Sequence, residues 1–304
     1  MIIPLYIPGV AEYGFCKEKF ESAERMLEDS DTDKQENKQE LSAVLKILGQ
    51  NPDAVRFLKA EFGERYVQVY DRLTKISPFS GLELTVDEFS ADNGKKRTQN
   101  DWFDYWDDVN DGRVMVSMGS LYQTFKLLKR MSEDGTNEDI VLAQRFVDSL
   151  RDDFDWSGKK NWLISSTRVN YSGNDNLDGK IIQYYRSKQA ELMKQTNLTI
   201  PVYRDTQITE VIKDIDGLVY LQTLFDTEDD SEEIMRALEF ISGKGRSKIK
   251  VWSAATDGKV WKYTRDSDPT RAAGFDCYVS EFRVFGSGDV VSQGCSRGVL
   301  ISPR

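Results

Sequence analysis

The sequence predicts an α+β protein, in which a largely helical amino-terminal region, 1–158, precedes a mixed α/β domain, 159–304. Two observations predict this order. Apolar side chains recur at helical spacing through most of the first region. From Lys248 onward the pattern changes to short alternating stretches separated by Gly, Ser and Asp, which is typical of strands joined by turns. A hydrophobic content of 39% is enough to fill one large core or two smaller ones.

The chain begins with MIIPLYIPGV, which lacks a basic segment and contains two prolines, so we expect a first strand there rather than a signal peptide. Two helices are expected next. Gly49 caps the end of the first helix. Asn51 and Pro52 provide the N-cap and the first turn of the second helix, which continues to Leu73. The apolar faces of these helices comprise Leu41, Val44, Leu45, Leu48, Val55, Leu58, Phe62, Tyr66 and Val69.

A strand and an aromatic segment follow. The alternation in LELTVDEF, which ends at Phe89, predicts the strand. The segment 100–112, NDWFDYWDDVNDG, interleaves aromatic and acidic residues, as sugar-binding and metal sites also do. Its spacing does not fit a calcium loop, because the glycine comes too early. We therefore expect Trp102, Phe103 and Trp106 to pack onto helices while the acids face water.

The next stretch alternates helical and extended patterns. Helices are predicted at 121–131 and 138–150, and the run NWLISSTRVNY, 161–171, is predicted to be a buried strand. The elements expected after it are a helix at 177–194, an extended segment at 198–203 and a helix at 209–225.

A helix and a hairpin are then expected. Asp230 and Glu233 resemble a capping box at the start of the helix, and Gly243 ends it. The GKGRSK that follows lacks the glycine spacing of a phosphate-binding loop. The runs IKVWSA and KVWKYT, joined by a turn at Asp257 and Gly258, predict a β-hairpin.

The tail contains three further short extended pieces, GFDCYV, EFRVF and GVLI. We expect Phe275, Phe282 and Val284 to face a core. Positions in turns or on solvent-facing sides are expected for Asp276, Tyr278, Ser280, Ser287 and Asp289.

Composition excludes several classes of function. The chain contains no histidine, which rules out catalytic triads and dyads built on an imidazole and all histidine-ligated metal sites. A formal net charge of -10 argues against nucleic acids and anionic membranes as partners. No apolar run is long enough to span a membrane. Cys16, Cys277 and Cys295 do not form a disulfide framework, so we expect reduced thiols. We expect no catalytic residue, bound metal or cofactor.

The last third of the chain resembles a known family. It combines a tryptophan-bearing hairpin, the Arg-Ala-Ala-Gly-Phe strand 271–275, a loop of mixed composition and the Ser-Arg-Gly-Val strand 296–299. This order resembles the C-type-lectin-fold variable proteins that retroelements diversify in phages, bacteria, and archaea with their viruses. The variable-looking tail spans 252–298. Unlike the family, the tail is not rich in Asn or Trp, and the helical region has no counterpart in it.

The resemblance implies a non-enzymatic ligand-binding or display protein with lectin-like β-hairpins. In that family, diversity enters at adenines of AAC or AAT codons, so variable sites carry residues whose codons end in a pyrimidine. The implied ligand-binding residues are Asp276, Cys277, Tyr278, Val279, Ser280, Phe285, Gly286, Ser287, Gly288, Asp289, Ser292 and Cys295. The implied partner is a macromolecule, foremost a surface protein, met in the cytoplasm or on a virion. The oligomeric state stays open.

Two other functions compete with this interpretation. A viral or cellular assembly protein also suits a helical platform with a β-rich end, and it predicts a stable homo-oligomer whose interface includes the tail. A hydrolase without histidine requires two facing carboxyl groups with separated pKa values in a cleft near the aromatic residues. Asp104, Asp107 and Asp108 are the candidates for that pair.

Overall fold

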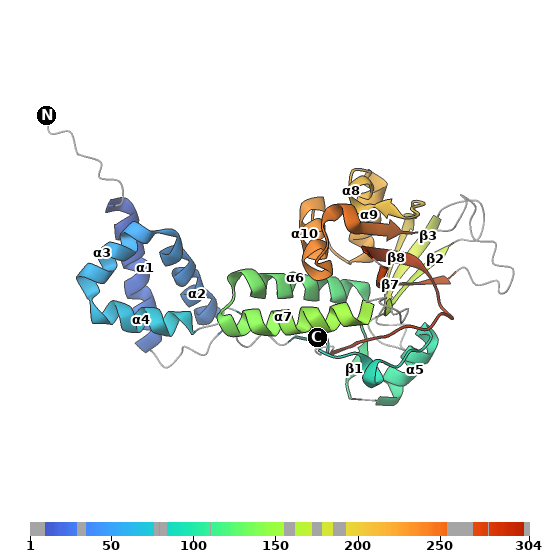
Figure 1. The fold of residues 1–304 in the computed structure, drawn as a ribbon, viewed down its shortest axis with the longest axis horizontal. Coiled ribbons are helices and arrows are strands. Elements are labelled where there is room, and N and C mark those ends of the chain that lie inside the picture. Colours follow the sequence, from blue (N-terminus) through green and yellow to red (C-terminus); the bar gives the residue numbers. More distant parts are fainter. Residues whose placement is uncertain are drawn as a thin grey trace. The chain divides into compact units, whose positions relative to one another are not determined.

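The computed structural model describes residues 10–28, 35–75, 79, 84–109, 111–154, 162–171, 178–184, 193–253, 270–278 and 280–300. The fold is α+β, as the sequence predicts (Figure 1). The chain forms two compact units. The first comprises Met1–Glu83 and Arg130–Ala143, and the second comprises Leu84–Lys129 and Gln144–Arg304. The expected boundary at residue 158 falls inside the second unit.

Four amphipathic helices lie within the first unit. They are α1 (Val10–Glu28), α2 (Gln35–Gln50), α3 (Pro52–Phe62) and α4 (Glu64–Thr74). Residues at spacings of three and four turn to one side of each helix and are buried together. This core consists of Cys16, Phe20, Ala23, Leu27, Leu41, Val44, Leu48, Ala54, Leu58, Tyr66, Val69 and Leu73.

The ends of these helices differ from the prediction. Gly63 has a φ of +54°, a conformation that favours glycine, and it separates α3 from α4, so the expected continuous helix through this region is wrong. Gly49 lies within α2, which continues to Gln50, and therefore does not cap it. Helix α3 does begin at Pro52, as predicted. Asn51, however, donates from its side chain back to the carbonyl of Ile47 at 2.7 Å instead of capping α3.

A seven-stranded mixed sheet organises the second unit, in the order β4-β3-β2-β7-β8-β6-β5. Only the β6–β8 pair among these is parallel. A separate two-stranded sheet pairs β1 with β9. The strands are β1 (Arg113–Met115), β2 (Trp162–Tyr171), β3 (Asp178–Tyr184), β4 (Met193–Thr199), β5 (Thr206–Gln207), β6 (Ile249–Trp252), β7 (Thr270–Tyr278), β8 (Glu281–Asp289) and β9 (Gly298–Leu300).

Helices cover the sheet, with α5 and α10 on different sides of it (Figure 1). They are α5 (Gln99–Val109), α6 (Met118–Asp134), α7 (Asn137–Phe154), α8 (Ile208–Val211), α9 (Ile215–Leu224) and α10 (Ser231–Ser242), with 3-10 turns at Ala91–Gly94 and Arg246–Lys248. The start of α10 is confirmed, because Asp230 accepts from the backbone N–H groups of Glu232 and Glu233, both at 2.9 Å. Its end is confirmed by Gly243, whose φ is +62°.

Aromatic rings fill the core between the sheet and the helices α6 and α7. Phe275 lies with its ring centroid 5.3 Å from Phe125, 5.5 Å from Phe282 and 6.2 Å from Phe225. Phe154 contacts Phe282 edge-on at 5.4 Å. The prediction that Phe275 and Phe282 face a core is confirmed, and Val284 on the same strand is also fully buried.

Several predicted elements form as expected. The strand predicted at 161–171 is β2, and the helices predicted at 121–131 and 138–150 are α6 and α7. The piece EFRVF lies in β8, and the described part of GFDCYV, residues 274–278, lies in β7. Within α5, Trp102, Phe103 and Trp106 are buried, as predicted.

Other predicted elements are wrong. The described parts of the segment 177–194, expected to be a helix, are instead strand β3 and the start of β4, because the two isoleucines of β3 are buried on opposite faces of a paired strand. The strand expected at 81–89 reduces, in its described part, to one bridge between Val86 and Val299. The helix expected at 209–225 is divided between α8 and α9.

The hairpin expected after Lys248 is described only as far as its first strand, β6, which pairs with β5 and β8. Its turn, its second strand and the strand expected at the amino terminus lie outside the described residues. The extended segment expected at 198–203 begins as the end of β4 and continues without regular pairing.

Candidate functional site

The tail strands β7 and β8 present two different faces. Phe275, Phe282 and Val284 point toward the aromatic core. Because side chains alternate along a strand, Asp276 and Arg283, which pair across β7 and β8, point to the opposite side. The same row continues to Trp162 on β2 and to Lys250 on β6, and the neighbouring row holds Phe285 beside Trp252. We call the side of the sheet that carries Asp276, Arg283 and Lys250 the charged face.

Ion pairing holds the charged face together. Arg283 donates from Nε and Nη2 to the two oxygens of Asp276, at 2.5 and 2.8 Å. Burial raises the pKa of Asp276, and Arg283 opposes part of that rise. The Arg283 guanidinium also lies 5.8 Å from the ring centre of Trp252. The expectation that Asp276 lies on a solvent-facing side is wrong, because its carboxylate neutralises a half-buried arginine.

Other residues of the implied ligand-binding set are packing residues. Phe285 is buried against Trp162, with 4.9 Å between the ring centroids. A Cβ at Gly286 would lie 2.3 Å from the hydroxyl oxygen of Tyr220, so no larger side chain fits there without movement. Cys295 is buried as well, and burial raises the pKa of its thiol to about 11. These three positions do not offer side chains to a partner in this conformation.

Two of the remaining residues of that set, Ser280 and Ser292, lie beyond opposite ends of β8. Ser280 is exposed in the turn that joins β7 to β8, and Ser292 is exposed beyond the other end of β8. Nine residues of strand separate these ends by about 27 Å, so the set does not form one compact patch. The rest lie as follows: Cys277, Ser287 and Gly288 are half-buried, Tyr278 and Asp289 are described only by their strand pairing, and Val279 lies outside the described residues.

The connection from β8 to β9 carries the most exposed part of the tail. We call Val291, Ser292 and Gln293 the displayed turn, because all three are exposed and the Val291 side chain keeps 66% of its surface accessible. The backbone on both sides is fixed. Gln99 donates to the carbonyl of Val290 at 3.2 Å. Beyond the turn, a two-bond bridge joins residues 97 and 294 at 3.0 and 3.1 Å.

Two buried tryptophans donate hydrogen bonds to the backbone of the same connection between β8 and β9. The indole of Trp162 donates to the carbonyl of Gln293 at 2.8 Å, and the indole of Trp102 donates to the carbonyl of Gly294 at 2.7 Å. Arg97 stacks on Trp102, with its guanidinium carbon 4.7 Å from the ring centre. The sequence could not reveal this role, because it places Trp102 and Gly294 almost two hundred residues apart.

A buried charge network lies at the base of the connection. Arg297 is fully buried and donates to Asp153 Oδ2 at 2.7 Å, Ser149 Oγ at 2.8 Å and the carbonyl of Asp87 at 2.9 Å. Burial raises the pKa of Asp87 to about 6, against the opposing effects of the Gly298 N–H bond and nearby arginines. The Ser-Arg-Gly-Val segment therefore belongs to the framework of the second unit.

The acids of α5 do not form a facing pair. Asp104 and Asp108 are one turn apart on the exposed side of the helix, opposite the buried tryptophans, as expected. Asp107, on the same helix, is half-buried, so the expectation that these acids face water is met by the other two. A hydrolytic pair requires two carboxyl groups on opposite sides of a substrate. This arrangement therefore gives no support to the hydrolase alternative.

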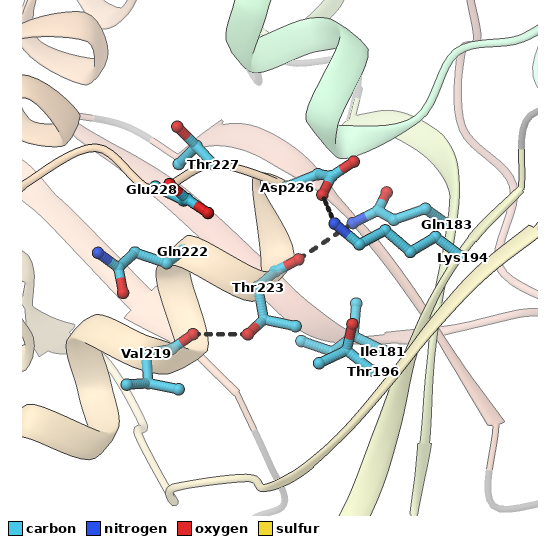
Figure 2. Close-up of a pocket in the computed structure, with 10 residues that line it drawn as sticks. All are labelled: Ile181, Gln183, Lys194, Thr196, Val219, Gln222, Thr223, Asp226, Thr227 and Glu228. Atoms are coloured by element: carbon cyan, nitrogen blue, oxygen red, sulfur yellow. Dashed lines mark hydrogen bonds and ion pairs between the residues drawn. The ribbon is translucent and has the colours of Figure 1, made fainter.

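A separate polar pocket of about 380 Å³ lies between β3 and β4 on one side and α9 with its following turn on the other (Figure 2). Lys194 and Thr196 extend from β4 into it, and Lys194 forms an ion pair with Asp226. Gln183 is buried at its edge and donates to the carbonyls of Leu224 and Thr223 at 2.8 and 3.3 Å.

No family model, no curated protein and no solved structure matches this chain. Among the helices that the structure describes, none combines the length and the apolar character needed to cross a membrane.

Proposed function

We propose that this chain is a non-enzymatic binding protein whose second unit presents the displayed turn to a macromolecular ligand, foremost a surface protein. The observation that carries the proposal is the contrast between exposed side chains at the turn and the fixed backbone beneath it, held by the indoles of Trp102 and Trp162. A loop held in one conformation by a rigid scaffold loses little entropy when it binds. Recognition then depends on the side chains of the turn alone.

The resemblance of the tail to retroelement-diversified variable proteins supports the same kind of function. Such a protein requires positions that can change without disturbing the fold. Val291 and Ser292 meet this requirement, because their side chains are exposed and each can be encoded by a codon that ends in a pyrimidine. Asp276, Phe285 and Cys295 do not meet it, because each packs or pairs inside the unit. The proposed binding surface therefore differs from the set that the resemblance implies and shares Ser292 with it.

The test is to place a photo-crosslinking amino acid at Ser292 in the full chain, expressed in the cells that naturally make it, and to identify the captured partner. Binding of that purified partner is then measured for Val291→Asp. Val141→Asp is the matched control, because Val141 keeps 68% of its surface exposed against 66% for Val291. We expect at least a tenfold loss of affinity for Val291→Asp and none for Val141→Asp. Equal affinities for the two variants would falsify the proposal.

The same experiment separates the assembly alternative. If the captured partner is a second copy of this chain, and Val291→Asp converts a stable oligomer into a monomer by light scattering, then the turn is an assembly contact rather than a ligand-binding surface. A monomeric wild-type protein that captures a different macromolecule supports the binding function.

A further inference from the structure

The polar pocket between β4 and α9 lies on a part of the second unit that the displayed turn does not touch. Side chains of β3 and β4 form one wall, and side chains of α9 and the turn after it form the other (Figure 2). Its volume of about 380 Å³ falls within the range of roughly 300 to 1,000 Å³ found for small-molecule sites. The walls therefore leave room for one small ligand.

The acidic wall of the pocket is held in a costly conformation. Asp226 has a φ of +47°, which non-glycine residues adopt at an energetic cost. Gly119 on α6 leaves room for the Asp226 side chain, because a Cβ at position 119 would lie 2.9 Å from the Cβ of Asp226. The side-chain amide of Gln183 donates two hydrogen bonds to the backbone carbonyls of Thr223 and Leu224, which shortly precede Asp226. The hydroxyl of Thr167 donates to the amide oxygen of Gln183 and so orients this side chain. The carboxylate of Asp226 is thus positioned in advance beside Lys194.

The pocket offers donors and acceptors side by side. The ammonium group of Lys194 has three N–H donors, and its ion pair with Asp226 uses one of them. Thr223 already donates to a helix carbonyl at 2.8 Å, so its oxygen faces the pocket as an acceptor. Gln222 likewise donates its amide N–H to a backbone carbonyl at 3.0 Å, which leaves its amide oxygen as an acceptor. Glu228 adds a carboxylate, which only accepts.

The charges of the pocket disfavour an ionic ligand of either sign. An anion would approach Asp226 and Glu228, and a cation would approach Lys194. A hydroxyl group both donates and accepts, so several neighbouring hydroxyls can satisfy donors and acceptors together without bringing an unpaired charge into the site. We propose that the polar pocket binds a small neutral polyol, such as one sugar ring or a cyclitol. No aromatic ring is among the described residues that line the pocket, so stacking adds nothing and affinity is modest.

The test uses the full chain and ligand-observed saturation-transfer NMR. The neutral probes are methyl β-glucopyranoside and myo-inositol, and the charged probes are inorganic phosphate and spermidine. We expect at least one neutral probe to bind with a roughly millimolar dissociation constant. Both charged probes are expected to bind at least tenfold more weakly. Tighter binding of either charged probe, or no binding of both neutral probes, overturns the proposal.

Variants locate the binding within the pocket. Thr196→Val keeps the branched shape that suits a strand and removes one hydroxyl, so we expect about three- to tenfold weaker polyol binding. Thr74→Val makes the same change on an exposed end of α4 and is expected to bind as the wild type does. Glu228→Gln, on the exposed turn, is a second pocket variant whose effect does not depend on strand packing, and it is also expected to weaken polyol binding. Wild-type affinity in both pocket variants contradicts the assignment.

The proposed polyol site and the proposed macromolecular binding by the displayed turn can be tested independently. Val291→Asp is expected to leave polyol binding unchanged, because Val291 does not line the pocket. Thr196→Val is expected to leave capture of the macromolecular partner unchanged for the same reason. A loss of both functions in one of these variants would indicate misfolding, which the amide NMR spectrum of the variant reveals directly.

Discussion

At the scale of single residues, the base of the displayed turn depends on charges that are buried and paired. Arg297 has no exposed surface, yet three donors on its guanidinium find partners on α7 and on the segment before α5. Removing one member of such a group leaves the other charge buried without a partner, which is far more costly than losing an exposed ion pair. The sequence marks Arg297 only as part of a short tail strand, because burial of an arginine depends on acids that lie far away in the chain.

Asp87 makes this network sensitive to pH. Its pKa in the folded protein is about 6, against 3.8 for the ordinary side chain, so the folded state holds a proton that the unfolded state has lost between these pH values. The stabilisation is fully present below about pH 4 and disappears as the pH rises through 6. Asp87→Asn cannot lose a proton. We therefore expect the stability of this variant relative to wild type to rise by about 2 kcal/mol between pH 4 and pH 7.

Urea unfolding at several pH values measures this difference. Arg113, Arg297 and Asp153 also face Asp87, and comparing the variant with the wild type cancels the contributions that they share. Parallel stability curves for the two proteins across this pH interval would show that Asp87 does not titrate as described.

At the scale of elements, local patterns predict what each strand buries but not what it pairs with. The alternation in the tail correctly places Phe275 and Phe282 in a core. It fails for Asp276, because only the register of β7 against β8 brings Arg283 opposite it. The prediction of a helix over β3 is wrong because a strand that is buried on both faces lacks the alternation of apolar and polar residues by which strands are recognised. The displayed turn could not be predicted, because the indoles that bind its backbone come from β2 and α5, which lie far away in the chain.

Gly288 tests whether the tail strands tolerate variation. A Cβ there would lie 2.9 Å from both the carbonyl oxygen of Ala272 and the ring of Trp162, so Gly288→Ala must push apart two strands or a buried ring. We expect it to lower the free energy of unfolding by about 1 to 3 kcal/mol in urea titrations. Gly245→Ala is the matched control, because nothing lies within 4 Å of a Cβ at that position. A Gly288→Ala protein as stable as the Gly245→Ala protein would mean that the position is free to vary.

At the scale of the whole molecule, the chain divides into a helical unit and a sheet-containing unit that each have their own apolar cluster. This division could not be predicted from the point at which the sequence changes from helical spacing to alternating, strand-like stretches. The long helices α6 and α7 look like their helical neighbours in sequence, yet most of their residues belong with the sheet. Assignment of a helix to a unit depends on which surface its apolar side covers, and amphipathic spacing alone does not identify that surface.

Separate cores predict separate unfolding. Phe20 is fully buried in the first unit, where its ring lies 4.9 Å from Phe62 and 5.5 Å from Tyr66, so Phe20→Ala is expected to destabilise that unit by roughly 3 to 5 kcal/mol. Hydrogen exchange followed by mass spectrometry should show faster exchange in peptides from α1 to α4 and unchanged exchange in peptides from β7. Phe57→Ala, at a side chain of the same unit that is 52% exposed, should change neither set. Faster exchange of β7 in Phe20→Ala would mean that the two units unfold as one, and the displayed turn would then depend on the helical unit for its stability.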